Sequence, residues 1–130
     1  MGETQTVLLV EDEALIGLCT GDLLEAEGFS VIPATSPAEA IAVLDERGDG
    51  VSSLFVDINL ASGMSGFELA RDARRRRPGI GVLYTSGVQP SDFESRCVPG
   101  ARFIEKPYDA RRVGEILRAM SSSRAQADGA

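Results

Sequence analysis

The sequence has no histidine and no tryptophan, and it has a single lysine, Lys106. The absence of histidine excludes imidazole-based catalytic triads, zinc sites with histidine ligands and a histidine pH switch. The two cysteines, Cys19 and Cys97, lie far apart in the sequence and form no motif. We therefore expect two buried or half-buried thiols in a reducing compartment.

The sequence also lacks an N-terminal targeting pattern and any apolar run long enough to cross a membrane. Its formal net charge of −7 argues against general binding to nucleic acids or to anionic membranes. We expect a cytoplasmic protein with no nucleic-acid or membrane partner. The 130 residues are enough for one domain. We expect this domain to cover residues 1–120 and to be followed by a disordered tail over the small, polar residues 121–130.

Short apolar runs alternate with segments that carry apolar residues at helical spacing. The predicted strands cover residues 7–10, 29–34, 54–57, 80–84 and 101–104, and the predicted helices cover residues 14–26, 37–47, 67–77, 91–97 and 110–120. Five strands alternating with five helices predict an α/β fold with a doubly wound, five-stranded parallel sheet. Right-handed crossovers favour the flavodoxin-like strand order 2-1-3-4-5. Pro33 suits an edge strand, because proline cannot donate a hydrogen bond to a neighbouring strand.

Local patterns mark the helices more closely. Ser36 can cap the second helix, and Glu39 can complete a capping box. The basic residues 74–77 end the third helix, where cations complement the helix dipole, so we favour a structural role for them over nucleic-acid binding. In the first helix, apolar residues recur at helical spacing at Ala14, Leu15, Leu18, Cys19 and Leu23.

Acidic residues follow two of the predicted strands. Glu11 and Asp12 come directly after the first strand, and Asp57 lies at the end of the third, too far from the next helix to cap it. The predicted strand order makes these strands neighbours, and open α/β sheets bind ligands at the carboxyl ends of their strands. Three carboxylates at one place repel each other by about 1 kcal/mol per pair in water. We therefore expect a divalent cation, and Mg²⁺, which keeps several waters, suits an open crevice better than Ca²⁺.

The same edge of the sheet gathers groups that can handle a phosphoryl group. Lys106 follows the fifth strand and adds a positive charge, and Thr85 or Ser86 adds a hydroxyl donor after the fourth. These residues, in this order and spacing, resemble the receiver domains of the bacterial two-component response regulator family over essentially residues 6–120. The matching elements are the pair Glu11 and Asp12, then Asp57, Thr85 and the pair Lys106 and Pro107.

The resemblance implies a role for each of these residues. Asp57 would be the phosphoacceptor, attacking a phosphohistidine on a partner kinase. Mg²⁺ would be held by Asp12 directly, by Glu11 mostly through a water, by Asp57 and by the backbone carbonyl of Asn59. Lys106 would pair with the phosphoryl oxygens.

The resemblance also implies roles in the conformational switch that follows phosphorylation. Thr85 would move in to hydrogen-bond the phosphoryl group, Phe103 would be the aromatic switch residue, and the Lys106–Pro107 bond would be cis. The sequence departs from the commoner family pattern at two residues, with Glu11 in place of Asp and Phe103 in place of Tyr. Its fourth helix is short. Its loop over residues 60–66 is one residue longer than in the commoner pattern and resembles the loop of receivers attached to hybrid histidine kinases.

We expect a stand-alone receiver that works as a phosphoryl-accepting switch or as a phosphorelay intermediate. It would be a signalling domain rather than an enzyme, catalysing only its own phosphorylation and dephosphorylation. Its partners would be a histidine kinase or a histidine phosphotransfer protein and a downstream protein target, and it would be a monomer or a weak dimer. Two alternatives remain open. The first is a phosphohydrolase that uses Asp57 as its nucleophile, but such enzymes usually have a second acid where this chain has Asn59. The second is a pseudo-receiver that is never phosphorylated, but such a protein would not need the intact set of Asp57, Thr85 and Lys106.

Overall fold

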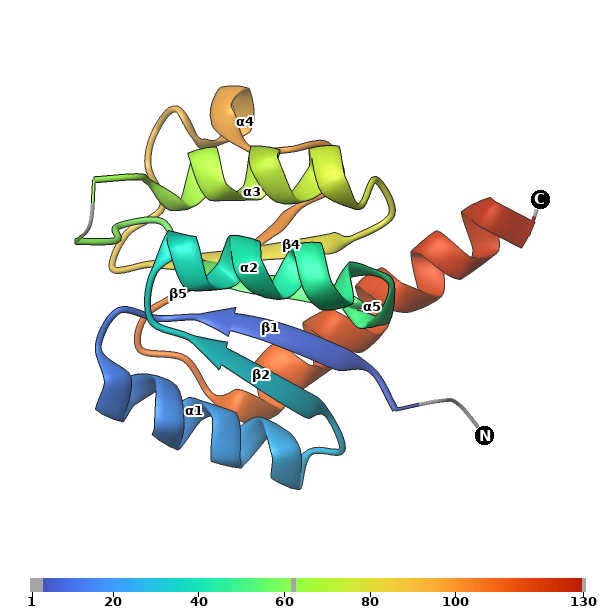
Figure 1. Cartoon of the computed structure of the whole chain (residues 1–130), viewed down its shortest axis with the longest axis horizontal. Coiled ribbons are helices and arrows are strands. Elements are labelled where there is room, and N and C mark those ends of the chain that lie inside the picture. Colours follow the sequence, from blue (N-terminus) through green and yellow to red (C-terminus); the bar gives the residue numbers. More distant parts are fainter. Residues whose placement is uncertain (1–3, 62, 130) are drawn as a thin grey trace.

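The computed structural model describes residues 4–61 and 63–129, and all of their side chains except those of residues 48 and 122–129. Strands and helices alternate along the chain (Figure 1). The strands are β1 Thr6–Val10, β2 Ser30–Ala34, β3 Ser53–Asp57, β4 Gly81–Ser86 and β5 Arg102–Glu105. The helices are α1 Ala14–Ala26, α2 Pro37–Arg47, α3 Gly66–Arg76, α4 Phe93–Arg96 and α5 Ala110–Gly129, with a 3₁₀ turn, η1, at Gly48–Gly50.

The strands form one parallel sheet in the order β2-β1-β3-β4-β5. The predicted doubly wound fold and its strand order are therefore confirmed. Pro33 lies in the edge strand β2, as its missing amide hydrogen predicts. Because β1 and β3 are neighbours, the ends of both strands open at the same place on the sheet.

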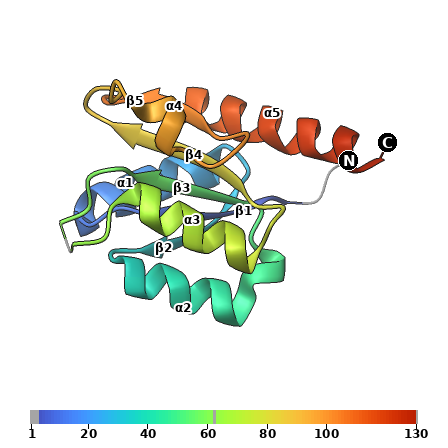
Figure 2. The same cartoon turned by 90° about the horizontal axis from the view of Figure 1, so that it is seen from above.

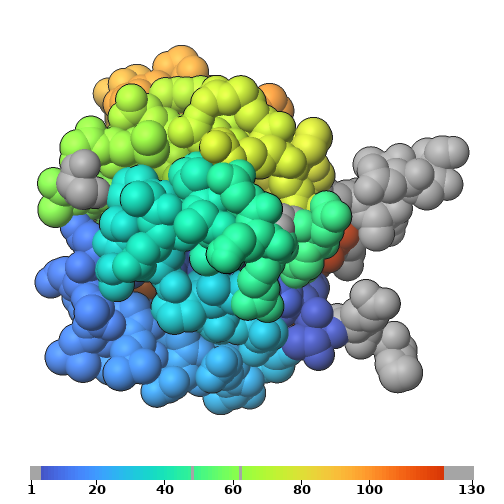
Figure 3. Space-filling view, viewed as in Figure 1, coloured from blue at the N-terminus to red at the C-terminus, as the bar shows by residue number. Residues whose placement is uncertain are grey.

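Helices cover both faces of the sheet, and each face has its own apolar core (Figure 2). Successive side chains of a strand point to opposite faces. In β3, Leu54 and Val56 pack with α2, α3 and Phe93 of α4, whereas Phe55 packs with α1 and α5. In the space-filling view α2 and α3 lie side by side over the first of these faces (Figure 3).

Helix α1 differs from the expected arrangement. It buries Gly17, Thr20, Gly21 and Leu24 rather than its apolar stripe. The small residues let the helix lie close to the sheet; a Cβ on Gly21 would already be 3.4 Å from the Val31 side chain. The apolar residues face outward, and the exposed fractions of three of them are 73% for Leu15, 61% for Leu18 and 57% for Leu23.

Two further expectations need correction. Cys19 is exposed on α1, so the prediction of a buried or half-buried thiol is wrong there, whereas Cys97 is half-buried. Helix α5 continues to Gly129, although residues 121–130 were predicted to form a disordered tail. Alanine, arginine and glutamine are good helix formers, and no glycine or proline interrupts residues 121–128. In the described part of the chain, no helix is long and apolar enough to cross a membrane.

The ends of α2 and α3 show how local signals act. Ser36 Oγ accepts from the Glu39 amide, but the Glu39 carboxylate accepts from the amide and hydroxyl of Thr35 instead of closing the predicted box. The basic run at the end of α3 was expected to stay solvated, but two of its arginines are half-buried and bind backbone carbonyls. Arg74 donates to the Ile80 carbonyl at 2.8 Å and Arg77 to the Val51 carbonyl at 2.6 Å.

Candidate functional site

Asp57 ends β3 in a crevice at the carboxyl edge of the sheet and is only 5% exposed. Its Oδ2 lies 2.5 Å from Lys106 Nζ, and its Oδ1 accepts a hydrogen bond of 2.9 Å from the Asn59 amide. Lys106 Nζ also lies 3.7 Å from Glu11 Oε1. One ammonium group therefore pairs with two carboxylates that come from different strand ends.

The charges of the site depend on one another. Burial acts to lower the pKa of Lys106, but the hydrogen bond and the negative charge of Asp57 outweigh it, so this pKa is raised. The pKa of Glu11 is raised by burial, against the opposing effect of its hydrogen bond from the Glu13 amide. Lys106 thus stays protonated at neutral pH and can hold a negative group beside Asp57.

The three predicted acids converge only in part. Glu11 and Asp57 meet at Lys106, but Asp12 Oδ2 accepts a hydrogen bond of 2.8 Å from the Ala61 amide in the loop after β3. Among the described residues, no three acidic or cysteine side chains are grouped closely enough to hold a metal ion. Carboxylate oxygens are nevertheless the donors that Mg²⁺ prefers. Asp12 also lies within hydrogen-bond reach of the Glu11 side chain, so the carboxylate donor set fits such an ion.

The structure distinguishes between the two candidate hydroxyls. Thr85 pairs with Asp57 on the neighbouring strand and is 3% exposed, and its Oγ1 has no hydrogen-bond partner among the described residues. Ser86 Oγ already donates to the Val88 carbonyl at 2.8 Å. A buried hydroxyl without a partner costs free energy. Of the two candidate hydroxyls, that of Thr85 is thus the one without a hydrogen-bond partner among the described residues.

Phe103, the predicted switch residue, is half-buried on β5. Its ring lies edge-on to Phe93 of α4, with the ring centroids 5.4 Å apart. Phe93 also packs edge-on to Tyr84, whose hydroxyl accepts a hydrogen bond of 3.2 Å from the Val98 amide. The short helix α4 is therefore held to the sheet by aromatic contacts that begin one residue before Thr85.

The loop after β5 carries Lys106 and is fixed on two sides. The Lys106–Pro107 peptide bond is cis, as predicted. The Lys106 amide donates to the Ser86 carbonyl at 2.9 Å. The Tyr108 hydroxyl lies 3.2 Å from Thr20 Oγ1 of α1, and its ring packs edge-on to Phe55. These contacts position the lysine relative to β4 and α1.

Sequence reasoning missed the role of Gly66. It is the first residue of α3, and a Cβ there would collide with the Asp57 carbonyl oxygen and lie 2.8 Å from Ile58 Cα. Ser65 caps the same helix, and a full capping box with Glu68 fixes its start. The Ser-x-x-Glu spacing could have revealed the box. No pattern in the neighbouring sequence predicts that the backbone at Gly66 approaches the backbone of Asp57 and Ile58 so closely.

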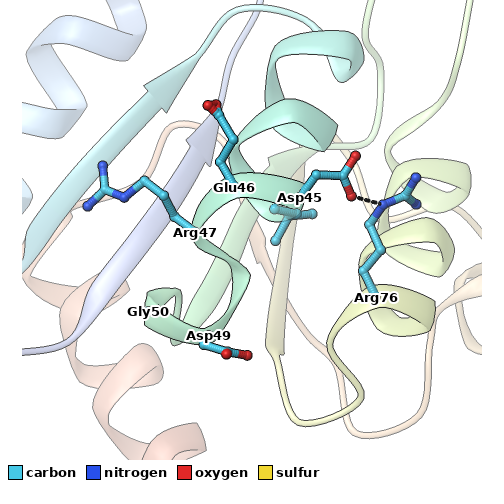
Figure 4. Close-up of a pocket in the computed structure, with 7 residues that line it drawn as sticks. Asp45, Glu46, Arg47, Asp49, Gly50 and Arg76 are labelled. Carbon is cyan, nitrogen blue, oxygen red and sulfur yellow. Dashed lines mark hydrogen bonds and ion pairs between the residues drawn. The ribbon is translucent and has the colours of Figure 1, made fainter.

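Two hollows have different relations to this site. One, of about 480 Å³, adjoins the crevice and is lined by Ile16, Thr20, Lys106, Pro107 and Tyr108. The other, of about 520 Å³, lies where α2 and α3 end, and the ion pair of Asp45 and Arg76 borders it (Figure 4). In a parallel α/β fold these helix ends lie at the edge of the sheet opposite to Asp57, so the second hollow has no part in the site.

The chain matches a known protein family over most of its length. The sequence matches the profile of the response regulator receiver domain over residues 7–118. The chain belongs to this family. Receiver domains are the phosphoryl-accepting signalling domains of two-component systems, so the predicted family and general function are confirmed. The matched region includes every residue of the crevice.

Individual relatives agree with this assignment. A response regulator receiver protein from Sinorhizobium medicae WSM419 has a crystal structure that superposes with a TM-score of 0.85 at 30% identity, covering 94% of this chain and 98% of that one. The sensor kinase CckA of Brucella abortus (strain 2308) is 29% identical over 117 residues, which are 88% of this chain and 12% of that protein. The aerobic respiration control protein ArcA of Escherichia coli (strain K12) is 30% identical over 116 residues, 85% of this chain and 46% of that protein. The chain thus spans less than half the length of these two curated relatives.

Proposed function

We propose that Asp57 accepts a phosphoryl group from a phosphohistidine of a partner protein. The observation that carries this proposal is the buried Asp57 carboxylate, paired at 2.5 Å with Lys106. On the neighbouring strand, the Thr85 hydroxyl has no hydrogen-bond partner among the described residues. A nucleophile, a fixed cation and a free donor are the parts that phosphoryl transfer needs. No comparable second acid stands at Asn59, which disfavours the phosphohydrolase alternative.

The proposed phosphoryl transfer is a displacement at phosphorus. An Asp57 carboxylate oxygen attacks phosphorus, the phosphorus–nitrogen bond of the phosphohistidine breaks, and the imidazole nitrogen keeps the electron pair. The product is an acyl phosphate on Asp57. Lys106 remains charged and pairs with the added oxygens, and Thr85 donates its hydroxyl to one of them by a charge-assisted hydrogen bond.

A magnesium ion would complete the site. Asp12, Glu11, Asp57 and the Asn59 carbonyl are the residues that would hold it, Glu11 mostly through water. Bound there, the ion would offset the charge of the carboxylates and of the incoming phosphoryl group. Asp12 would then exchange its present bond with the Ala61 amide for the ion.

The partners we propose are a histidine kinase or a histidine phosphotransfer protein in the cytoplasm, and a downstream protein target. The outward leucines of α1, Leu15, Leu18 and Leu23, lie on the helix that borders the 480 Å³ hollow beside Lys106. Exposed apolar groups of this kind mark protein contact surfaces. A phosphodonor seated there would be next to the crevice. The protein itself would act as a switch or a relay, as a monomer or weak dimer.

Labelling with acetyl phosphate and Mg²⁺ tests the proposal, with intact mass spectrometry as the measurement. The wild-type chain should gain one phosphoryl mass, and Asp57→Asn should gain none. Asp22→Asn is the matched control, because Asp22 is an exposed acid on α1; it should be labelled like the wild type. Labelling of the Asp57→Asn variant would move the acceptor elsewhere. A wild type that neither this donor nor a histidine kinase can label would favour a pseudo-receiver.

A further inference from the structure

The Tyr108 hydroxyl connects the loop that carries Lys106 to helix α1. It lies 3.2 Å from Thr20 Oγ1, within hydrogen-bond distance. Thr20 is buried, and the other buried residues of α1 are two glycines and a leucine. Thr20 therefore brings a polar side chain to an otherwise apolar face of the helix. Since a buried hydroxyl without a partner costs free energy, the bond with Tyr108 satisfies a group that α1 would otherwise leave unpaired.

The Tyr108 ring is held from the side of the sheet as well. It packs edge-on to Phe55, with the ring centroids 5.3 Å apart. Phe55 lies on β3, two residues before Asp57. Tyr108 itself lies two residues after Lys106, and both line the hollow of about 480 Å³ together with Thr20. Tyr108 thus contacts the acceptor's strand and α1, and it adjoins the lysine that pairs with the acceptor.

The charges of the crevice act on the Tyr108 hydroxyl. Burial raises the pKa of Tyr108, and the hydrogen bond with Thr20 opposes this rise. The negative charges of Glu11 and Asp57 raise this pKa further, whereas the charge of Lys106 lowers it. The hydroxyl therefore stays protonated at neutral pH. A neutral hydroxyl can fix the loop without adding a negative charge that would compete with the acceptor for the lysine.

We propose that Tyr108 and Thr20 are positioning residues: their bond fastens the loop of Lys106 to α1 and so keeps the ammonium group at the acceptor for phosphoryl transfer. This inference rests on the proposed phosphoacceptor role of Asp57. A lysine ammonium group is carried by a flexible four-carbon chain, so its backbone must be fixed if the charge is to stay in one place. The Lys106 amide is attached to the Ser86 carbonyl of β4, and the Tyr108 bond adds an attachment on α1.

A single NMR signal can report the position of Lys106, because it is the sole lysine in the chain. The wild type, Tyr108→Phe, Thr20→Val and the double variant are produced with lysine labelled at Cε and compared at one pH, without Mg²⁺ or a phosphodonor. The signal of each single variant should move from the wild-type position toward that of the urea-unfolded chain. The double variant should show the same shift as the single ones, because both substitutions remove the same bond.

Labelling with acetyl phosphate and Mg²⁺ measures the consequence for the reaction. Each single variant should gain its phosphoryl mass about three to ten times more slowly than the wild type, the range that one net hydrogen bond supports. The double variant should be no slower than the single ones. Thr20→Ser keeps a hydroxyl and should restore both the wild-type signal and the wild-type rate.

Thr6→Val is the matched control. Thr6 begins β1, at the edge of the sheet opposite to Lys106, so the variant exchanges the same atoms far from the loop. It should show the wild-type lysine signal and be labelled like the wild type. Thermal unfolding of all variants separates the roles, since a merely structural bond would lower the melting temperature and leave the lysine signal and the labelling rate unchanged.

Several results would overturn the inference. These are a wild-type lysine signal in Tyr108→Phe, a moved signal with a wild-type labelling rate, or effects that multiply in the double variant. A wild-type chain that takes up no phosphoryl group would overturn the proposed function and the role in transfer together. Normal labelling of the wild type, with the same rate in both single variants, would overturn the inference alone.

Discussion

Gly66 offers the sharpest test of how the fold positions the acceptor. Its amide donates to the Ile58 carbonyl at 2.8 Å, and its Cα faces the backbone of Asp57 and Ile58. In Gly66→Ala, the new methyl group would meet the Asp57 carbonyl oxygen and would lie 3.0 Å from the carbonyl carbon. These atoms are backbone, so no flexible side chain can move aside. Either α3 or the end of β3 must shift.

The size of the effect follows from two opposing terms. Overpacking a buried site costs about 1–3 kcal/mol, and contact with rigid backbone favours the upper part of that range. Alanine gains at most about 1 kcal/mol over glycine in a helix. We expect Gly66→Ala to lower the free energy of unfolding by about 2 kcal/mol. With a urea m-value of about 1.5 kcal/mol/M, the unfolding midpoint falls by about 1.3 M.

Urea titration followed by circular dichroism measures this change. Gly79→Ala is the control, because a Cβ at Gly79 has no neighbour within 4 Å; its midpoint should stay the same or rise slightly. Gly66→Ala should also be labelled more slowly by acetyl phosphate without urea, since the shift reaches Asp57. Equal midpoints for the two variants would show that the close approach does not position the acceptor.

Three further results are expected. Ser65→Ala removes the cap of α3 and should cost about 1 kcal/mol in urea unfolding, and an unchanged midpoint would contradict this. Lys106→Arg should be labelled far more slowly by acetyl phosphate, because a planar guanidinium cannot replace a compact ammonium; wild-type labelling would argue against its role. Burial raises the pKa of Tyr84, with the hydrogen bond from the Val98 amide opposing. Tyr84 ionises more readily in the unfolded chain, so stability should fall as the pH rises above 10. Tyr84→Phe, compared with the wild type by thermal unfolding across that range, should show a weaker fall, and an equal one would exclude Tyr84 as a source.

The sequence by itself determined the architecture and the place of the chemistry. Apolar runs separated by helical patterns predicted the five strands and the five α-helices, although not the 3₁₀ turn η1 or the extension of α5 beyond residue 120. The handedness of crossovers left one favoured strand order. That order brought the ends of β1 and β3 together, so Glu11 and Asp57 could be expected in one crevice with Lys106. These inferences hold because periodicity and chain order are properties of the sequence alone.

Only the tertiary structure decided how particular side chains are used. Helical spacing marked an apolar stripe on α1, but close packing through Gly17 and Gly21 turned Leu15 and Leu18 to solvent. A helical period does not say which face meets the sheet when small residues allow a closer approach.

The details of the crevice were also beyond the sequence. Asp12 pairs with the amide of Ala61, 49 residues away, and only the bond from Ser86 to Val88 shows that Thr85 carries the free hydroxyl. The approach of Gly66 to the Asp57 backbone is of the same kind. Such contacts depend on the rotamers and distances of segments that meet only after folding, and no pattern along the chain records them.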